Sequence, residues 1–329
     1  MTFAPFERVA LIGLGLIGSS LSLGMQRGGL AREIVGTARS EDTRRTAEQI
    51  GLVSRAFASA REAVDAADLV ILCVPVGVNA ALAEEIGPHL RDGAIVTDVG
   101  SVKMAVIEAI RPHIPDGVWF VAGHPISGSE RTGPEAGFAE LFDDRWCVLT
   151  PDRNTDGDRR ATERLTAFWR ALGSNVEIMD PAHHDLVLAV TSHLPHLIAY
   201  NIVNTATHLE RVTDTEVIKF SAGGFRDFTR IAASDPTMWR DVFLNNREAT
   251  LEMLGRFSED LSALQRAIRY GDGDAMFEMF SRAQDVRRGI IDAGQDTAEA
   301  DFGRRAVAGD DERDDKRQAD AVGRSRSGE

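Results

Sequence analysis

The stretch "VALIGLGLIGSSL", residues 9–21, decides the fold. An apolar run ends at Gly13, and Gly15 and Gly18 complete a Gly-x-Gly-x-x-Gly pattern that opens a second apolar segment. Between a strand and a helix, this pattern predicts a tight turn at Gly13 and close strand–helix packing at Gly18. It also predicts that the backbone at Gly15 closely approaches a pyrophosphate, whose oxygens would receive N–H groups from the helix N-terminus.

Short β-rich runs alternate with helical segments from residue 8 to about residue 150. The runs are apolar on both faces, which is typical of a parallel sheet covered by helices on both sides. We therefore predict an α/β fold, a Rossmann-type doubly wound and mostly parallel sheet, with one more helix and strand over residues 164–180. The runs are "RVALIG" (8–13), "EIVGTA" (33–38), "DLVILCVP" (68–75), "AIVTDVG" (94–100), "VWFVAGHP" (118–125) and "WCVLTP" (146–151).

The character of the chain changes after Asp180, where strand signals give way to long segments of helical apolar periodicity. These segments predict an all-α second domain. From about Ala300 the chain carries many charges and few large apolar residues, so it cannot offset its ordering entropy and should be disordered. The predicted division is a dinucleotide-binding domain (1–180), a helical substrate-binding and dimerisation domain (181–299) and a charged tail (300–329).

The chain is acidic, with 37 Lys and Arg against 51 Asp and Glu and a net charge of −14. This balance disfavours nucleic acid and anionic membranes as partners. Cys73 and Cys147 lie in apolar runs without metal or disulfide spacing, which fits a reducing cytoplasm and no metal site. The N-terminus shows no export signal, and no stretch is expected to approach the length of a membrane span.

The end of the second predicted strand bears on the choice of cofactor. Thr37 or Ala38 occupies the position where an Asp or Glu would bind the adenosine ribose, and Arg39 and Ser40 follow. A carboxylate there would repel a 2′-phosphate, whereas Arg39 and Ser40 can bind one. The pattern favours NADP, with NAD as the alternative if Arg39 is a solvated surface charge. The expected cofactor-binding residues are Gly13, Gly15, Leu16, Ile17, Gly18, Arg39, Ser40, Val74, Pro75 and Ser101.

Two further stretches, "TDVGSVK" (97–103) and "GHPISGSE" (123–130), place polar groups at the carboxyl ends of predicted strands. Ligands of open α/β sheets bind at that edge, so Ser101 and His124 should face the nicotinamide. A histidine there can accept a hydroxyl proton while hydride leaves the same carbon.

The stretch "TSHLPHLIAY" contains Pro195, which should kink or interrupt a helix. His193 and His196 share one face of this apolar segment, where polar residues indicate a wet cleft or a ligand. His183 and His184 are interpreted as helix-start residues without a chemical role.

The stretch "SAGGFRDFTRIA" carries Arg226 and Arg230 four residues apart. Two guanidinium groups on one helix face suit carboxylate binding and would give an acidic chain the local positive site that an anionic substrate requires. We expect Arg226 to pair with Asp227 or Asp235, and Arg230 less so.

Taken together, the motifs "GLGLIGSS", "DVGSVK", "GHPISGSE", "TSHLPH" and "GGFRDFTR" resemble the prephenate dehydrogenase family. This family includes the arogenate and cyclohexadienyl dehydrogenases of tyrosine biosynthesis, and the resemblance covers roughly residues 8 to 290. It implies oxidative decarboxylation of prephenate, or arogenate, to 4-hydroxyphenylpyruvate, or tyrosine, with hydride transfer to NAD(P). It also implies a homodimer formed through the helical domain.

The resemblance assigns roles to matching positions. His124 resembles the catalytic histidine that takes the proton of the ring hydroxyl, and Ser101 resembles the serine that contacts that hydroxyl and the histidine. Arg230 resembles the arginine that binds the ring carboxylate, and His196 resembles the histidine near the substrate side chain. The predicted substrate-binding residues are Arg230, His196, Arg226, His193, and Ser129 and Glu130 at the entrance.

Other functions fit parts of the pattern. A β-hydroxyacid or 6-phosphogluconate-type dehydrogenase needs a catalytic lysine in the second domain, where Lys219 is the only lysine between residues 104 and 315. A non-catalytic NADP-sensing regulator would not need Ser101, His124, His196 and Arg230 together. An enzyme that oxidises an amino-substituted prephenate requires the same hydride geometry.

Overall fold

A computed structural model of the 329-residue chain describes residues 3–128, 131–207, 216 and 219–292. The chain forms two compact units, Met1–Arg256 and Phe257–Glu329. The charged tail lies outside the described residues, and the expected division at residues 180 and 299 stays a prediction.

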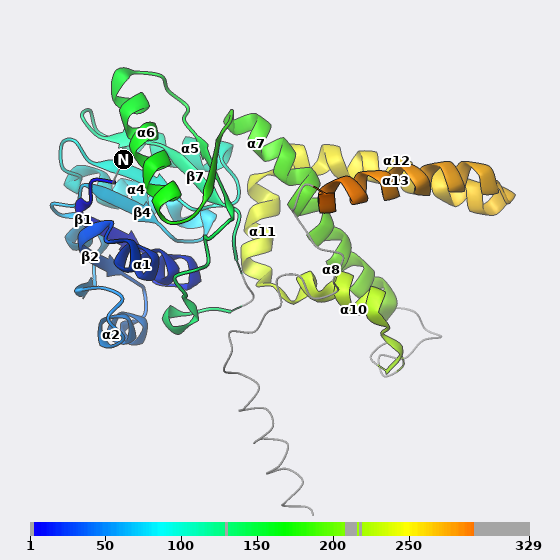
Figure 1. Cartoon of the computed structure of the whole chain (residues 1–329), viewed down its shortest axis with the longest axis horizontal. Coiled ribbons are helices and arrows are strands. Elements are labelled where there is room, and N and C mark those ends of the chain that lie inside the picture. The colour runs from blue at the N-terminus through cyan, green and yellow to red at the C-terminus, as the bar shows by residue number, and fades with distance from the viewer. Residues whose placement is uncertain (1–2, 129–130, 208–215, 217–218, 293–329) are drawn as a thin grey trace, which may run out of the picture. The chain divides into compact units, whose positions relative to one another are not determined.

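A six-stranded parallel sheet forms the centre of the first unit (Figure 1). Its strand order is β3-β2-β1-β4-β5-β6, so the chain starts in the middle and winds outward in both directions. This arrangement confirms the predicted doubly wound sheet. The strands are β1 (Phe6–Ile12), β2 (Ala31–Thr37), β3 (Arg55–Phe57), β4 (Leu69–Leu72), β5 (Ile95–Asp98) and β6 (Trp119–Phe120).

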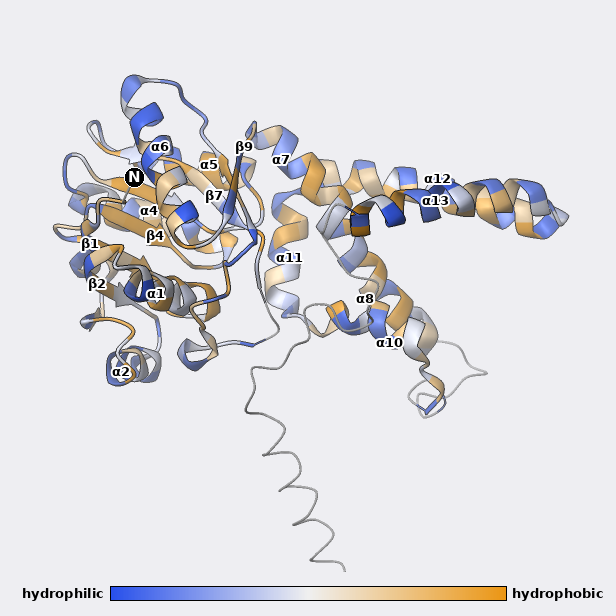
Figure 2. Ribbon diagram, viewed as in Figure 1, coloured by the Kyte–Doolittle hydropathy of each residue, from blue (hydrophilic) through white to orange (hydrophobic). Residues whose placement is uncertain are grey.

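Helices cover both faces of this sheet because successive strand residues point to opposite sides. Val9 and Leu11 of β1 belong to one buried cluster, and Ala10 and Ile12 belong to the other. Figure 2 shows β4 as apolar, as a strand buried on both faces must be, and β1 is buried continuously from Val9 to Ile12. The first face packs against α1 (Leu16–Gly28), α2 (Glu41–Gln49) and α6 (Asp156–Ala171), and the second against α3 (Ala60–Val64), α4 (Asn79–Ile86) and α5 (Met104–Ile110).

A second, three-stranded sheet departs from the expectation of one continuous sheet. Its strands are β7 (Ala122–Pro125), β8 (Trp146–Thr150) and β9 (Asn175–Ile178), with β7 and β8 antiparallel. Residues 118–125 were expected to form one strand, but they divide at Val121 between β6 and β7. The N–H of Gly123 donates to the Asp98 side chain (3.1 Å) rather than to a strand carbonyl, so the parallel ladder ends there.

From Pro181 onward the described residues form helices, as predicted. The interruption at Pro195 is also confirmed: a π-helical turn directly precedes α8 and accommodates a proline that lacks an N–H group. The elements are α7 (Pro181–Leu188), the π turn (Ala189–His193), α8 (Leu194–Thr207), α10 (Gly223–Thr229), a 3₁₀ turn (Arg230–Ala233), α11 (Pro236–Asn245), α12 (Arg247–Tyr270) and α13 (Gly273–Asp292).

Helix α11 joins the helical segment to the core of the first unit. Asp235 caps it by accepting from the N–H of Thr237 (2.7 Å), and Trp239 and Val242 pack into the second apolar cluster. In the second unit, Gly271 ends α12 with a left-handed φ of 70°. The side chain of Asp272 then caps α13 by accepting from the N–H of Ala275 (3.0 Å).

The expectation that no stretch approaches the length of a membrane span is wrong, judged by the length and composition of one helical segment. Residues Pro181–Thr207 form a helical segment that is long and apolar enough to cross a bilayer. The same segment contains His184, Asp185 and His193, which are buried in polar contacts within the first unit. Charged and polar groups of this kind are costly in lipid, so the contacts favour a packed helix of a folded domain.

Candidate active site

The glycine loop has the shape of a dinucleotide cradle. At Gly13, where φ is 109°, an added Cβ would lie 2.3 Å from the Cys73 carbonyl oxygen. At Gly18 an added Cβ would lie 2.1 Å from the Gly13 carbonyl oxygen, whereas at Gly15 it would meet nothing within 4 Å. Of these three glycines, only Gly15 faces open space, which is where a pyrophosphate would approach the backbone.

The helix behind this loop fits an anion. The first turn of α1 contains no acidic residue, so the N-terminal end of the helix keeps its partial positive charge. Leu16 and Ile17 are only partly buried at this end, and Val74, with Pro75 beside it, lies next to Gly13. These residues fit the dinucleotide that the sequence predicts.

The end of β2 presents one exposed arginine beside structural groups. The Ser40 side chain caps α2 by accepting from the N–H of Thr43 (3.5 Å). Arg44 donates to the carbonyls of Ala38 (2.6 Å) and Arg39 (2.9 Å), which ties it to this turn. The side chain of Arg39 is exposed, and the hydroxyl of Ser40 can still donate to a ligand.

A buried ion pair fixes the backbone that carries His124. Nζ of Lys103 donates to Oδ2 of Asp98 (2.5 Å) and to the carbonyl of Gly123 (2.6 Å), and both side chains are almost completely buried. Since Asp98 also accepts from the N–H of Gly123, the residue before His124 is held at both its backbone groups. Ser101 lies in the loop between Asp98 and Lys103, so the contacts of these two side chains with Gly123 join the Ser101 loop to the strand that carries His124.

His124 is in contact with a residue from α7. Its Nδ1 lies 2.9 Å from Nε2 of His184, and Nδ1 of His184 lies 2.8 Å from Oδ1 of Asp185. The expected helix start is confirmed, because α7 begins at Pro181. The interpretation that His184 has no chemical role stays a prediction, and the tertiary fold packs its ring against His124.

Burial controls the charge of these histidines. It lowers the pKa of His124 well below its usual value, and the nearby His184, Lys103 and His193 lower it further. Burial also lowers the pKa of His184, against the opposing effect of Asp185. Both rings are therefore neutral at neutral pH, and neutral histidine is the form that can accept a proton.

His193 is held by the side chain of Asn246, at the end of α11. Nδ2 of Asn246 donates to Nδ1 of His193 (3.1 Å) and to the carbonyl of Asp185 (2.8 Å). Burial lowers the pKa of His193 to about 4. These contacts give His193 a structural position, and its predicted role in substrate binding stays a prediction.

His196 and Arg230 are brought together by the fold. The ring of His196 stacks on Trp239 of α11 with a centroid distance of 3.6 Å and an interplanar angle of 23°. Its Nδ1–H donates to the Ser192 carbonyl (2.9 Å), which leaves Nε2 as an acceptor. Burial lowers the pKa of His196, and the charge of Arg230 lowers it further. An exposed guanidinium beside a neutral histidine suits an anionic ligand.

Arg226, Ser129 and Glu130 are the other predicted site residues. Nε of Arg226 lies 3.6 Å from Oδ1 of Asp227, so the expected pairing of Arg226 is confirmed. Ser129 and Glu130 lie outside the described residues.

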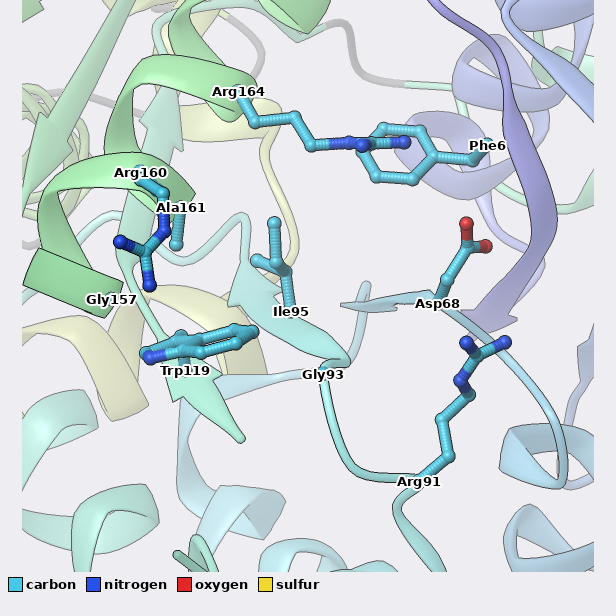
Figure 3. Close-up of a pocket in the computed structure, with 10 residues that line it drawn as sticks. All are labelled: Phe6, Asp68, Arg91, Gly93, Ile95, Trp119, Gly157, Arg160, Ala161 and Arg164. Atoms are coloured by element: carbon cyan, nitrogen blue, oxygen red, sulfur yellow. The ribbon is translucent and has the colours of Figure 1, made fainter. Parts of the chain in front are cut away.

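A pocket of about 330 Å³ lies at the opposite edge of the parallel sheet (Figure 3). It is lined by residues at the starts of strands, such as Phe6 and Ile95, whereas the glycine loop follows the end of β1. The guanidinium of Arg164 stacks 4.3 Å above the Phe6 ring. None of the predicted site residues lines this pocket.

The residues that the sequence analysis missed are buried polar side chains. Lys103 ends the motif "TDVGSVK", but no role was predicted for it, and Asn246 was not predicted as a site residue. His184 and Asp185 form a polar pair inside an apolar helix, which is the signal that could have drawn attention to them.

Two family models match the chain: the nucleotide-binding domain of prephenate dehydrogenase over residues 21–178 and its dimerization domain over residues 180–282. A cyclohexadienyl dehydrogenase from Zymomonas mobilis is 40% identical over 282 residues, which are 86% of this chain and 95% of that protein. The chain belongs to the prephenate dehydrogenase family.

Other members of the prephenate dehydrogenase family match to a similar extent. The prephenate dehydrogenase of Bacillus subtilis is 32% identical over 86% of this chain and 76% of that protein. The structure of prephenate dehydrogenase from A. aeolicus in complex with hydroxyphenyl propionate and NAD+ has a TM-score of 0.80 and 31% identity, covering 87% of this chain and 99% of that one. These matches confirm the family, the Rossmann-type fold and a nucleotide-binding oxidoreductase domain.

Proposed function

We propose that this prephenate dehydrogenase family member oxidises and decarboxylates prephenate, and arogenate as a second substrate, in tyrosine biosynthesis. The observation that carries the proposal is buried His124 on β7, which follows a glycine held by Asp98 and Lys103, the residues on either side of the Ser101 loop. The names of the relatives support the substrate class, because one is a cyclohexadienyl dehydrogenase and another a prephenate dehydrogenase.

The chain's own residues supply binding, orientation and one proton acceptor. Neutral His124 takes the proton of the ring hydroxyl, and Ser101 hydrogen-bonds the same oxygen. Arg230 pairs with the ring carboxylate, and His196 lies beside the substrate side chain. A bound nicotinamide dinucleotide supplies the hydride acceptor. The resulting ring ketone is a vinylogous β-keto acid, so the carboxylate leaves as CO2 and its bonding electrons aromatise the ring.

The cofactor we propose is NADP, with NAD as the alternative. Exposed Arg39 and the Ser40 hydroxyl at the end of β2 suit a 2′-phosphate, and no carboxylate stands at the usual ribose position. Arg39→Ser should raise the KM for NADP about tenfold, a loss of about 1.4 kcal/mol, and leave the KM for NAD unchanged. Arg45→Ser is the matched control, since Arg45 is exposed on α2 and pairs with Glu41.

The function is tested with purified protein by following nicotinamide reduction with prephenate and L-arogenate, each with NAD and with NADP. Turnover with at least one combination is expected, and His124→Asn should lower kcat by about 100-fold or more with a small change in KM. Silence in all four combinations, in folded protein that binds dinucleotide, would refute the proposed reaction. Wild-type turnover in His124→Asn would refute its role as proton acceptor.

The assembly we propose is a homodimer formed through the helical segment, in the cytoplasm. The dimerization-domain match supports the dimer, and both cysteines are free, as in a reducing compartment. Large apolar side chains are exposed in this segment of the described chain and would be covered in a dimer. They include Leu251, Leu261, Ile268, Phe277, Phe280 and Val286. Sedimentation analysis gives the oligomeric state directly, and a monomer at micromolar concentration would contradict the proposal.

A further inference from the structure

A row of hydrogen bonds leads from His124 into the start of a helix. Nδ1 of His124 contacts Nε2 of His184 (2.9 Å), and Nδ1 of His184 contacts Oδ1 of Asp185 (2.8 Å). The Asp185 carboxylate also accepts from the N–H groups of Lys103 (2.7 Å) and Met104 (2.9 Å) at the beginning of α5. The three hydrogen-bonded residues are buried, with exposed fractions of 8% for His124, 0% for His184 and 4% for Asp185, so water does not compete with these bonds.

The direction of each bond follows from the chemistry of Asp185. Because two backbone N–H groups donate to it, the carboxylate acts only as an acceptor, and Nδ1 of His184 must carry the proton between them. Neutral His184 then has no proton on Nε2, so Nε2 accepts from Nδ1–H of His124. Neutral His124 is thereby left with an unprotonated Nε2, the ring nitrogen that can accept a proton.

We propose that His184 and Asp185 are positioning residues that hold His124 in its Nδ1-protonated form and stabilise the positive charge formed when Nε2 takes a proton. The catalytic consequence rests on the proposed function, whereas the tautomer of His124 does not. In the opposite tautomer, Nε2–H would face the substrate hydroxyl and could not accept its proton. An acidic residue that orients a histidine in this way is a recurrent device of general-base catalysis.

The surroundings of His124 make a negative charge at Asp185 important. Besides burial, His184, Lys103 and His193 all oppose a positive charge on His124, and Lys103 is paired with Asp98. Asp185 is the carboxylate that reaches His124 through a hydrogen-bonded partner among the described residues. The titratable groups packed around His124 are Asp98, Lys103, Cys147, His184, Asp185 and His193.

The tautomer can be measured without any substrate. In the full-length protein labelled with ¹⁵N-histidine, the two-bond ring spectra report which nitrogen of each histidine carries the proton. We expect Nδ1–H on both His124 and His184, with the signals assigned through His124→Asn and His184→Gln. An Nε2–H tautomer at His124 would overturn the proposal, even if the enzyme were fully active. Silence of the wild type with every substrate would instead refute only the proposed function.

Kinetics test the consequence with a matched pair of variants. His183 and His184 are neighbours on α7, but His183 is exposed and only His184 contacts His124. His184→Ala should lower kcat by about 100-fold with little change in KM, since general-base steps contribute about 100-fold to 10⁴-fold. His183→Ala should match the wild type. His184→Gln should recover part of kcat, because its carbonyl can accept from Nδ1–H of His124. Equal activity of His184→Ala and His183→Ala would overturn the proposal.

The pH profile separates a charge effect from a structural one. Loss of the negative charge in Asp185→Asn makes protonation of His124 harder, so the acid limb of kcat/KM should move to lower pH while the plateau falls. A merely structural defect would lower the plateau and leave the limb in place, which would contradict the charge role. If Asp185→Asn does not fold, the ring spectra of the wild type and the His184→Gln kinetics still decide the question.

Discussion

The two glycines at the start of α1 should respond in opposite ways to the same substitution. At Gly15, φ is −88° and ψ is −164°, a conformation open to alanine, and the added methyl would meet nothing within 4 Å. Gly15→Ala should therefore change the free energy of unfolding by no more than about 0.5 kcal/mol. At Gly18 the methyl would lie 2.1 Å from the backbone oxygen of Gly13, which cannot rotate away.

Relief of that overlap requires the helix to move against the strand. Overpacking costs up to about 3 kcal/mol, and the gain in helix propensity returns up to about 1 kcal/mol, so Gly18→Ala should lose about 2 kcal/mol of stability. Gly15→Ala should instead weaken dinucleotide binding about tenfold or more, because its methyl occupies the space predicted for the pyrophosphate.

Urea unfolding followed by circular dichroism measures the first effect, and a titration of reduced dinucleotide fluorescence measures the second. Wild-type dinucleotide affinity in Gly15→Ala would refute the cradle. A stability loss in Gly15→Ala equal to that in Gly18→Ala would show that both glycines serve packing alone.

Three further changes test other parts of the site. Lys103→Met leaves Asp98 buried without its cation and should lower the free energy of unfolding, measured in urea, by about 3–5 kcal/mol. Adding Asp98→Asn should restore part of that loss, and a double variant without any recovery would contradict the ion-pair argument. The pKa of His193, lowered to about 4, means that the unfolded chain takes up a proton first as the pH falls. The contribution of His193 to the free energy of unfolding is intact above about pH 6.5 and is lost towards pH 4. Between neutral pH and about pH 5, the free energy of unfolding of the wild type should therefore fall by about 2 kcal/mol more than that of His193→Gln. Equal falls in the two proteins would refute this. Arg230→Gln should raise the KM for prephenate more than it lowers kcat, and a pure kcat effect would remove Arg230 from ground-state binding.

Much of the first unit could be predicted because its signals are local. β4 is a continuous apolar stretch and β1 is apolar from Val9 to Ile12, and the glycine spacing follows from backbone conformation and close contact within a short segment. The interruption before Pro195 is likewise local, since the missing N–H belongs to the residue itself.

The small sheet could not be predicted in this way. Residues 118–125 read as one apolar run, and their division depends on the bond from Gly123 to Asp98, which lies 25 residues earlier in the chain. The exposed apolar faces of α12 and α13 were visible as periodicity, but periodicity alone does not identify the partner surface.

The sequence by itself determined the doubly wound fold, the glycine cradle, His124 and Ser101 as candidates, and the family resemblance that the comparisons confirmed. Each of these depends on residue type and short-range spacing, which the chain carries without being folded. The tertiary structure alone decided what surrounds His124: His184 lies 60 residues further along the chain, and the Lys103–Asp98 pair holds the adjacent backbone. The physical reason is that a buried polar group must find its hydrogen-bond partners, and which partners it finds depends on how distant segments pack.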